Sequence, residues 1–238
     1  MALKVFGTDP ETQPKPRNSF ADDIVGRFHA GYMLNNRPAT VDEWRVTTGD
    51  PDVAERIHEL LGGDAPQKWE TKGENDIEIF SASAEVDIII EKASALRQRM
   101  VFRNREGKII YATDGEYKLD ASGRPTDEPD PDASLSFQER KQRGRDGLGP
   151  VPDIELYFRL ASDPDLGIFR FQTGSWSLVS DIAYNGIEQQ LAEATEDGPA
   201  TATLKLEPVS FVAKNGPRAG QTVSFTKSSI ANIKAQAA

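Results

Sequence analysis

The chain has 238 residues, of which 37% are hydrophobic and 28% are charged, as in a folded protein with some irregular segments. It contains no cysteine, which excludes disulfide frameworks, thiolate zinc sites, iron–sulfur clusters and cysteine nucleophiles. The formal net charge of −10 argues against tight autonomous binding to DNA, because phosphates repel an acidic protein at long range.

The N-terminal half predicts one helix followed by short strands. Residues 1–20 are rich in proline and polar residues, and we expect them to be loosely ordered. Apolar residues at helical spacing indicate a helix over 51–61, with Asp50 as its cap and Gly62 at its end. Strands, two of them in a hairpin, are predicted at 76–80, 86–90, 100–103, 108–113 and 117–119.

The C-terminal half begins with an acidic, proline-rich stretch at 121–133, which we interpret as a mobile loop. A short basic helix is predicted over 134–146, opened by Ser134, and a longer one over 178–194, weakened by Gly186. Strands are predicted at 153–161, 167–173, 201–206, 209–213 and 221–226, with a turn at 215–220.

These elements predict an α+β fold, mostly antiparallel sheet with two main helices, because strands and helices do not alternate regularly. In one interpretation the loop separates two lobes. The segments of this interpretation are a loose N-terminal segment, an N-terminal lobe, the mobile loop, a C-terminal lobe and a frayed tail, at residues 1–20, 21–120, 121–133, 134–228 and 229–238.

No pattern of residues indicates catalysis. Neither of the two histidines, His29 and His58, belongs to a metal-binding spacing, and a structural role is favoured for His29. Phosphate-cradling loops and the G-x-S-x-G elbow are absent. The acidic cluster at 70–76 would suit a metal-dependent nuclease, but its spacing is also that of a polar loop. We therefore expect no catalytic residue, no metal and no cofactor.

Charge is arranged in blocks of opposite sign, which indicates either solvated faces or a docking surface for a charged protein. Two basic segments are the candidate partner contacts. One follows the loop and the other is the turn at 214–218, where a rigid tip could reach a partner. Their cations are Arg140, Lys141, Arg143 and Arg145 in the first segment, and Lys214 and Arg218 in the second.

Nine phrases in fixed order carry a resemblance to a known family. They are Gly26–Gly31, Asn35–Pro38, Glu43–Pro51, Trp69–Gly73, Ala95–Met100, Tyr157–Leu160, Phe169–Phe171, Gly174–Leu178 and Leu206–Val223. Together they resemble the recombination directionality factors of Streptomyces temperate phages, over about residues 20 to 225.

The resemblance implies an accessory protein of a large serine integrase, whose own serine cuts and rejoins the DNA. Such a factor binds the integrase, with its zinc-containing C-terminal region and coiled-coil arm as the expected contact. It switches the integrase from integration to excision of the prophage, by recombination of attL with attR, and inhibits integration. DNA is then contacted only indirectly, through the integrase.

The expected location is the cytoplasm of a bacterial host, for a phage-encoded protein with no membrane contact. No apolar run approaches the roughly 18 residues that span a bilayer, and no secretory signal opens the chain. Three other functions remain open at this stage: a nucleic-acid-binding accessory protein of phage replication that uses the basic stretch at 97–108, a metal-dependent nuclease, and a structural virion protein.

Overall fold

The structure is a computed structural model, and it describes residues 24–34, 37–214 and 219–236. Within these ranges it contains four α-helices and two short 3₁₀ helices. They are α1 (Pro51–Leu61), α2 (Phe137–Arg145), α3 (Trp176–Tyr184), α4 (Ile187–Ala194), η1 (Ala93–Ala95) and η2 (Pro164–Leu166). Together with a large, mostly antiparallel sheet they confirm the predicted α+β class.

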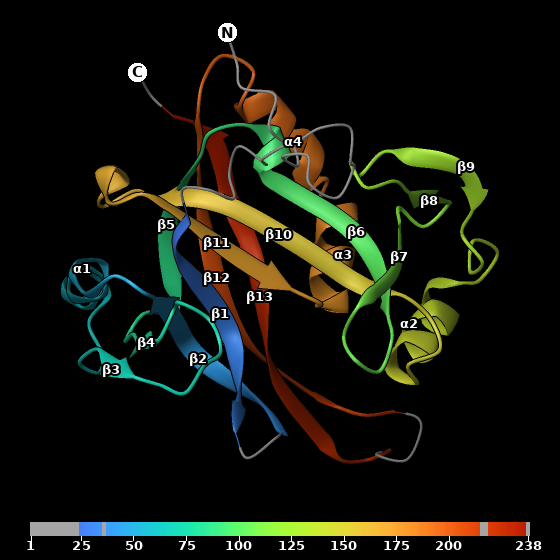
Figure 1. Ribbon diagram of the computed structural model, residues 1–238, viewed down its shortest axis with the longest axis horizontal. Coiled ribbons are helices and arrows are strands. Elements are labelled where there is room, and N and C mark those ends of the chain that lie inside the picture. Colours follow the sequence, from blue (N-terminus) through green and yellow to red (C-terminus); the bar gives the residue numbers. More distant parts are fainter. Residues whose placement is uncertain (1–23, 35–36, 215–218, 237–238) are drawn as a thin grey trace, which may run out of the picture.

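The strands form one branched sheet (Figure 1). In chain order they are β1 (Ile24–Leu34), β2 (Arg37–Thr48), β3 (Gln67–Lys68), β4 (Ile77–Phe80), β5 (Glu85–Ile90), β6 (Leu96–Arg103), β7 (Ile109–Thr113), β8 (Tyr117–Leu119), β9 (Pro125–Pro129), β10 (Val151–Leu160), β11 (Ile168–Thr173), β12 (Ala200–Val212) and β13 (Thr222–Ala235).

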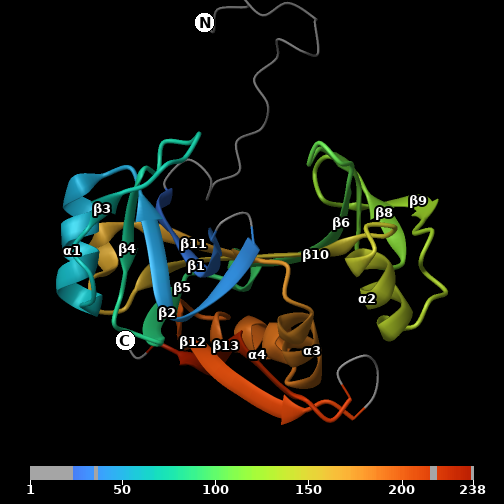
Figure 2. The same cartoon turned by 90° about the horizontal axis from the view of Figure 1, so that it is seen from below.

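The main path of the sheet runs β3-β4-β2-β1-β11-β10-β6-β7-β8-β9, and among the strands that the structure describes only the pair β1 and β11 is parallel. A second layer branches off where β5 pairs with the end of β10 and then with β12, which pairs with β13. Figure 2 shows β12, β13, α3 and α4 together on one side of the central strands. This layer covers one face of the sheet.

The alternation of side chains along each central strand decides what the two faces of the sheet carry. Phe28, Trp44, Phe158, Phe169 and Phe171 are at most 1% exposed and point toward the second layer, where their rings meet edge to face or stacked. The residues between them on the same strands are mostly polar. The core therefore lies on one side, and the other face is left for charged groups.

Two predicted helices differ from the structure in instructive ways. The helix expected over 178–194 is broken into α3 and α4 by Gly186, which adopts a left-handed backbone with φ 61°. Without a side chain, glycine enters this region readily. The basic helix begins at Phe137 rather than at 134. Its cap is Ser136, which forms a capping box with Glu139, so the assignment of Ser134 as the cap was wrong.

The predicted organisation of the chain also needs correction. The loop expected at 121–133 contains strand β9, and the tail expected to fray from 229 is paired as part of β13 up to Ala235. Strands β10 and β11 pair with β6 and β1, so the stretches assigned to separate lobes share one sheet and one buried cluster. Residues 1–20, for which we predicted loose order, lie outside the described residues.

Candidate partner-binding surfaces

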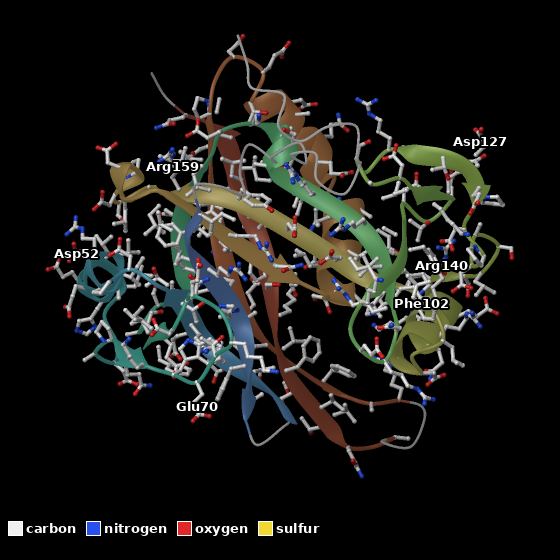
Figure 3. All side chains as sticks on the ribbon, in the orientation of Figure 1. Asp52, Glu70, Phe102, Asp127, Arg140 and Arg159 are labelled. Atoms are coloured by element: carbon white, nitrogen blue, oxygen red, sulfur yellow. The ribbon has the colours of Figure 1, made fainter. Side chains whose placement is uncertain are left out.

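The basic helix α2 brings together four of the predicted contact residues, but one of them is used inside the molecule. Arg140 Nη1 lies 3.2 Å from Asp130 Oδ2, and the two side chains are 14% and 0% exposed. Arg140 also donates hydrogen bonds to the backbone carbonyls of Gly115 and Leu135. It thereby ties α2 to the β7–β8 turn and to the segment after β9 (Figure 3).

The other three basic residues of α2 are more accessible. Arg143 contacts the buried carboxylate of Asp132 at 3.1 Å and donates to the carbonyl of Leu148, while its side chain stays 42% exposed. The ammonium group of Lys141 lies 6.0 Å from the centroid of the Phe137 ring, and Arg145 is exposed. The helix thus presents a basic surface, part of whose charge is already neutralised by acids on the preceding segment.

The second predicted contact lies at the end of a projecting ribbon made by the C-terminal half of β12 and the start of β13 (Figure 1). We call residues 208–213 and 219–226 the arm. Lys214 is exposed at its end, and Arg218 lies outside the described residues. The arm also exposes Phe211 and Val212, by 48% and 56%. Exposed apolar side chains on a projecting ribbon suit a protein contact.

A further charged surface was not predicted from the sequence. Six neighbouring strands, β4, β2, β1, β11, β10 and β6, place charged side chains on the face opposite the core. We call this set the arginine face. Its members are Arg27, Arg45, Arg97, Arg99 and Arg170, together with Glu78, Asp153 and Glu155.

Strand register brings these residues together. Arg27 and Arg170 are partners across the parallel pair β1 and β11. On the antiparallel pair β10 and β6, Glu155 is opposite Arg97 and Asp153 is opposite Arg99. Directly opposite residues are close neighbours in a sheet, so groups far apart in sequence form one surface.

The three carboxylates of the face are each matched by an arginine. The closest nitrogen–oxygen distances are 2.6 Å for Arg45–Glu78, 2.9 Å for Arg99–Asp153 and 3.8 Å for Arg170–Glu155. The carboxylate side chains are only 14%, 6% and 14% exposed. Glu74 and Glu188 also border this face, so positive charge is not in excess over the whole of it. It is concentrated at the centre, where the charges of Arg45, Arg27 and Arg170 all act on His29.

Hollows follow one another along the arginine face. The first, of about 800 Å³, is lined by His29, Arg45 and Trp69, and the Arg45 guanidinium lies 4.5 Å above the Trp69 ring. The second, of about 530 Å³, also contains His29 and Trp69 and adds Arg27. The third, of about 710 Å³, contains Arg170, the sheet neighbour of Arg27.

His29 is held neutral in this surface. Burial, then the charges of Arg45, Arg27 and Arg170, lower the pKa of His29 from 6.5 to about 4. Its Nε2 lies 2.8 Å from Thr47 Oγ1. A neutral, hydrogen-bonded imidazole at pH 7 agrees with the structural role favoured from the sequence.

The acidic cluster at 70–76 was considered above as part of a metal-dependent nuclease, and its Asp76 carboxylate is engaged by a lysine. Asp76 Oδ2 is 2.7 Å from Lys68 Nζ, and this contact lowers the pKa of Asp76. Among the described residues, no group of three or more histidine or acidic side chains is placed to hold a metal ion. Within the same residues, every helix is too short or too polar to cross a membrane.

A family model described as Gp3-like, recombination directionality factor-like, matches residues 25–231. The chain belongs to this family. The match includes every residue of the arginine face and the whole arm, so both surfaces lie in the part of the chain that the family shares. No solved structure matches this recombination directionality factor-like protein. Membership supports an accessory role in recombination.

The sequence contains a pattern of alternating polar and apolar residues that belongs to the arginine face, but we used it only to predict strands. In β10, Asp153, Glu155 and Tyr157 alternate with buried apolar residues, and Arg170 does so in β11. Such alternation shows that a strand has a polar face. It does not show which other strands bring their charges to the same face.

Proposed function

We propose that this protein binds a large serine integrase and switches it from integration to excision of the prophage, recombining attL with attR and inhibiting integration. The family match over residues 25–231 carries this proposal. Accessible charged surfaces on α2 and the arginine face, with exposed apolar side chains on the arm, support it, because a regulator of a large enzyme needs an extended docking surface.

The proposed mechanism is allosteric. The integrase keeps its own catalytic serine, and this protein contributes no catalytic group and no cofactor. It binds the synaptic arrangement that leads to excision more tightly than the one that leads to integration. Only this difference in affinity shifts the outcome, and each tenfold preference corresponds to about 1.4 kcal/mol.

The proposed contact on the integrase is its zinc-containing C-terminal region with the coiled-coil arm. On this protein, Lys141, Arg145, Lys214 and Arg218 stay proposed contacts. Arg140 and Arg143 are poorer tests of binding, because replacing them also leaves Asp130 and Asp132 without their arginine partners. The proposed setting is the cytoplasm of a bacterial host, with the protein encoded by the phage and DNA reached only through the integrase.

The test is a recombination reaction with purified integrase of a Streptomyces phage. Substrates carry either attL and attR, or the two sites used in integration, and recombinants are counted with and without this protein. We expect excision only when the protein is present, together with fewer integration products. A control protein of equal net charge should change neither reaction. Unchanged products with several integrases and a folded protein would contradict the proposal.

A further inference from the structure

We propose that the arginine face is the docking site for an acidic polypeptide segment of the partner protein. In identifying this partner as the recombinase, the inference rests on the function proposed above. The arginine face differs from the predicted contacts on α2 and the arm, and it is assembled from six strands rather than from one local segment.

Two arginines give a ligand access to the face. Arg27 is exposed near its middle, and the side chain of Arg99 is 39% exposed at its edge. Each lines one of the hollows, Arg27 the second and Arg99 the third. Guanidinium groups present a planar set of donors that matches a carboxylate. A carboxylate entering the second hollow therefore meets the Arg27 guanidinium, whereas Arg99 in the third already gives Nε and Nη2 to Asp153.

The pairing of Arg27 with Arg170 favours an anion between the strands. The two residues are partners in register, so like charges lie side by side. Burial and the charge of Arg170 lower the pKa of Arg27. The Nε of Arg170 is buried and has no hydrogen-bond partner among the described residues. A bound carboxylate would reduce the repulsion between these groups.

The same face is poorly suited to a nucleic acid. Glu78, Asp153 and Glu155 are fixed within it and would lie close to a continuous phosphate backbone. A polypeptide carries carboxylates at discrete positions, and its amide or hydroxyl groups between them can donate to the acids of the face.

The width of the six strands determines how long the docked acidic segment is. In Figure 2 the strands of the face run from β4, beside α1 and β3 at one end, to β6, beside β7, β8, β9 and α2 at the other. Six strands with neighbour spacings of about 4.8 Å span about 24 Å. An extended peptide covers this distance with about seven residues, at about 3.3 Å per residue. A peptide of eight residues is therefore a suitable probe.

The first experiment measures binding of a fluorescently labelled Glu-Ala repeat of eight residues by anisotropy, at low and high salt. We expect salt-sensitive binding that Arg27→Glu weakens at least tenfold. Lys234→Glu is the matched control, because it makes the same charge change at an exposed position on β13. It should bind like the wild type. Circular dichroism checks folding, and Arg27→Gln replaces Arg27→Glu if the latter does not fold.

Two results would overturn the inference. One is a Glu-Ala peptide that fails to bind, or that binds Arg27→Glu and wild type equally. The other is a labelled DNA 20-mer, single-stranded or duplex, that binds more tightly than the peptide at the same salt and is lost in Arg27→Glu. That result would make the arginine face a nucleic-acid site.

Recombination assays with the same variants separate this inference from the proposed function. If wild type and Arg27→Glu stimulate excision equally, the recombinase does not dock on the arginine face, although the directionality function stands. If the wild type has no effect on any integrase but binds the peptide through Arg27, the directionality function fails and the face serves another acidic partner.

Discussion

The two ends of the long sheet are held to the molecule by different forces. At one end, the helix wing (α1, β3 and β4) buries Val53, Ala54 and Ile57 of its helix against the core. At the other, the charged wing (β7, β8, β9 and α2) has a helix with no buried residue. Its helix is held through Asp130 and Asp132, whose side chains are 0% and 4% exposed beside arginines, and by an edge-to-face contact of the Phe137 ring with Trp176.

This difference predicts that the two wings respond differently to substitutions. Apolar burial stabilises the helix wing in proportion to area and couples it to the single core. Buried ion pairs contribute little net stability, but loss of one partner leaves a costly unpaired charge. The charged wing should therefore open locally, while the helix wing should unfold with the whole protein.

Arg140→Ala should open the charged wing. It leaves the fully buried carboxylate of Asp130 without its cation, at a cost of about 3–5 kcal/mol in a buried pair. Hydrogen exchange followed by mass spectrometry should show lost protection over residues 109–145 and little change in the helix wing. Arg124→Ala, at an exposed arginine on the β8–β9 turn, is the matched control. Unchanged protection in the charged wing would contradict the ion-pair account.

Ile57→Ala should destabilise the whole molecule. Ile57 is 0% exposed on the inner side of α1, and truncating a buried isoleucine costs about 2–4 kcal/mol through lost burial and a cavity. Urea unfolding should shift as one transition, with both wings affected. Glu55→Ala changes an exposed residue of the same helix and should stay within about 0.5 kcal/mol of wild type. A loss of stability confined to the helix wing would show that this wing unfolds independently of the core.

Lowering the pH should reduce the stability of the protein through His29, which lies near the centre of the sheet. The pKa of His29 is about 4 in the folded state and 6.5 in the reference state. As pH falls below 6.5, the unfolded chain binds a proton that the folded chain does not, so stability is lost as pH falls toward 4. Between pH 7 and 4.5 this amounts to about 2 kcal/mol. His29→Gln should show a smaller loss in urea titrations at the two pH values. Equal losses would exclude His29 as the cause.

Ser136→Ala should weaken only the charged wing, and by the smallest amount. Ser136 caps α2 by accepting a hydrogen bond from the Glu139 backbone, and loss of such a cap costs about 1 kcal/mol. Ser134→Ala is the control, because Ser134 is exposed and lies before the cap. Thermal melts and exchange of the α2 amides should separate the two variants. An equal effect would mean that the helix begins earlier.

Local signals explain which elements were predictable. Asp50, the apolar spacing within 51–61 and Gly62 act within one helix, and the predicted bounds are those of α1. Strands β1 and β2 were not predicted. Gly26 and Gly31 interrupt β1, and its stability comes from pairing with β2 and with the distant strand β11. Such long-range pairing leaves a weak local pattern.

Burial of charge was the feature least accessible to prediction. Asp130 and Asp132 stand in a proline-rich acidic stretch, which is typical of a solvated loop. They are buried because α2 supplies Arg140 and Arg143 to them. The basic segment was recognised from the sequence, but its partners within the chain were not, so its role was interpreted only as docking.

The amino-acid sequence by itself determined the α+β class, the main helix signals and the family resemblance, because periodicity, caps and ordered phrases are local properties of the chain. Tertiary structure alone decided the arginine face. Arg27, Arg97 and Arg170 are far apart in sequence and become one surface only through strand order and register. Those pairings depend on hydrogen bonds and burial across the whole sheet, which no local pattern encodes.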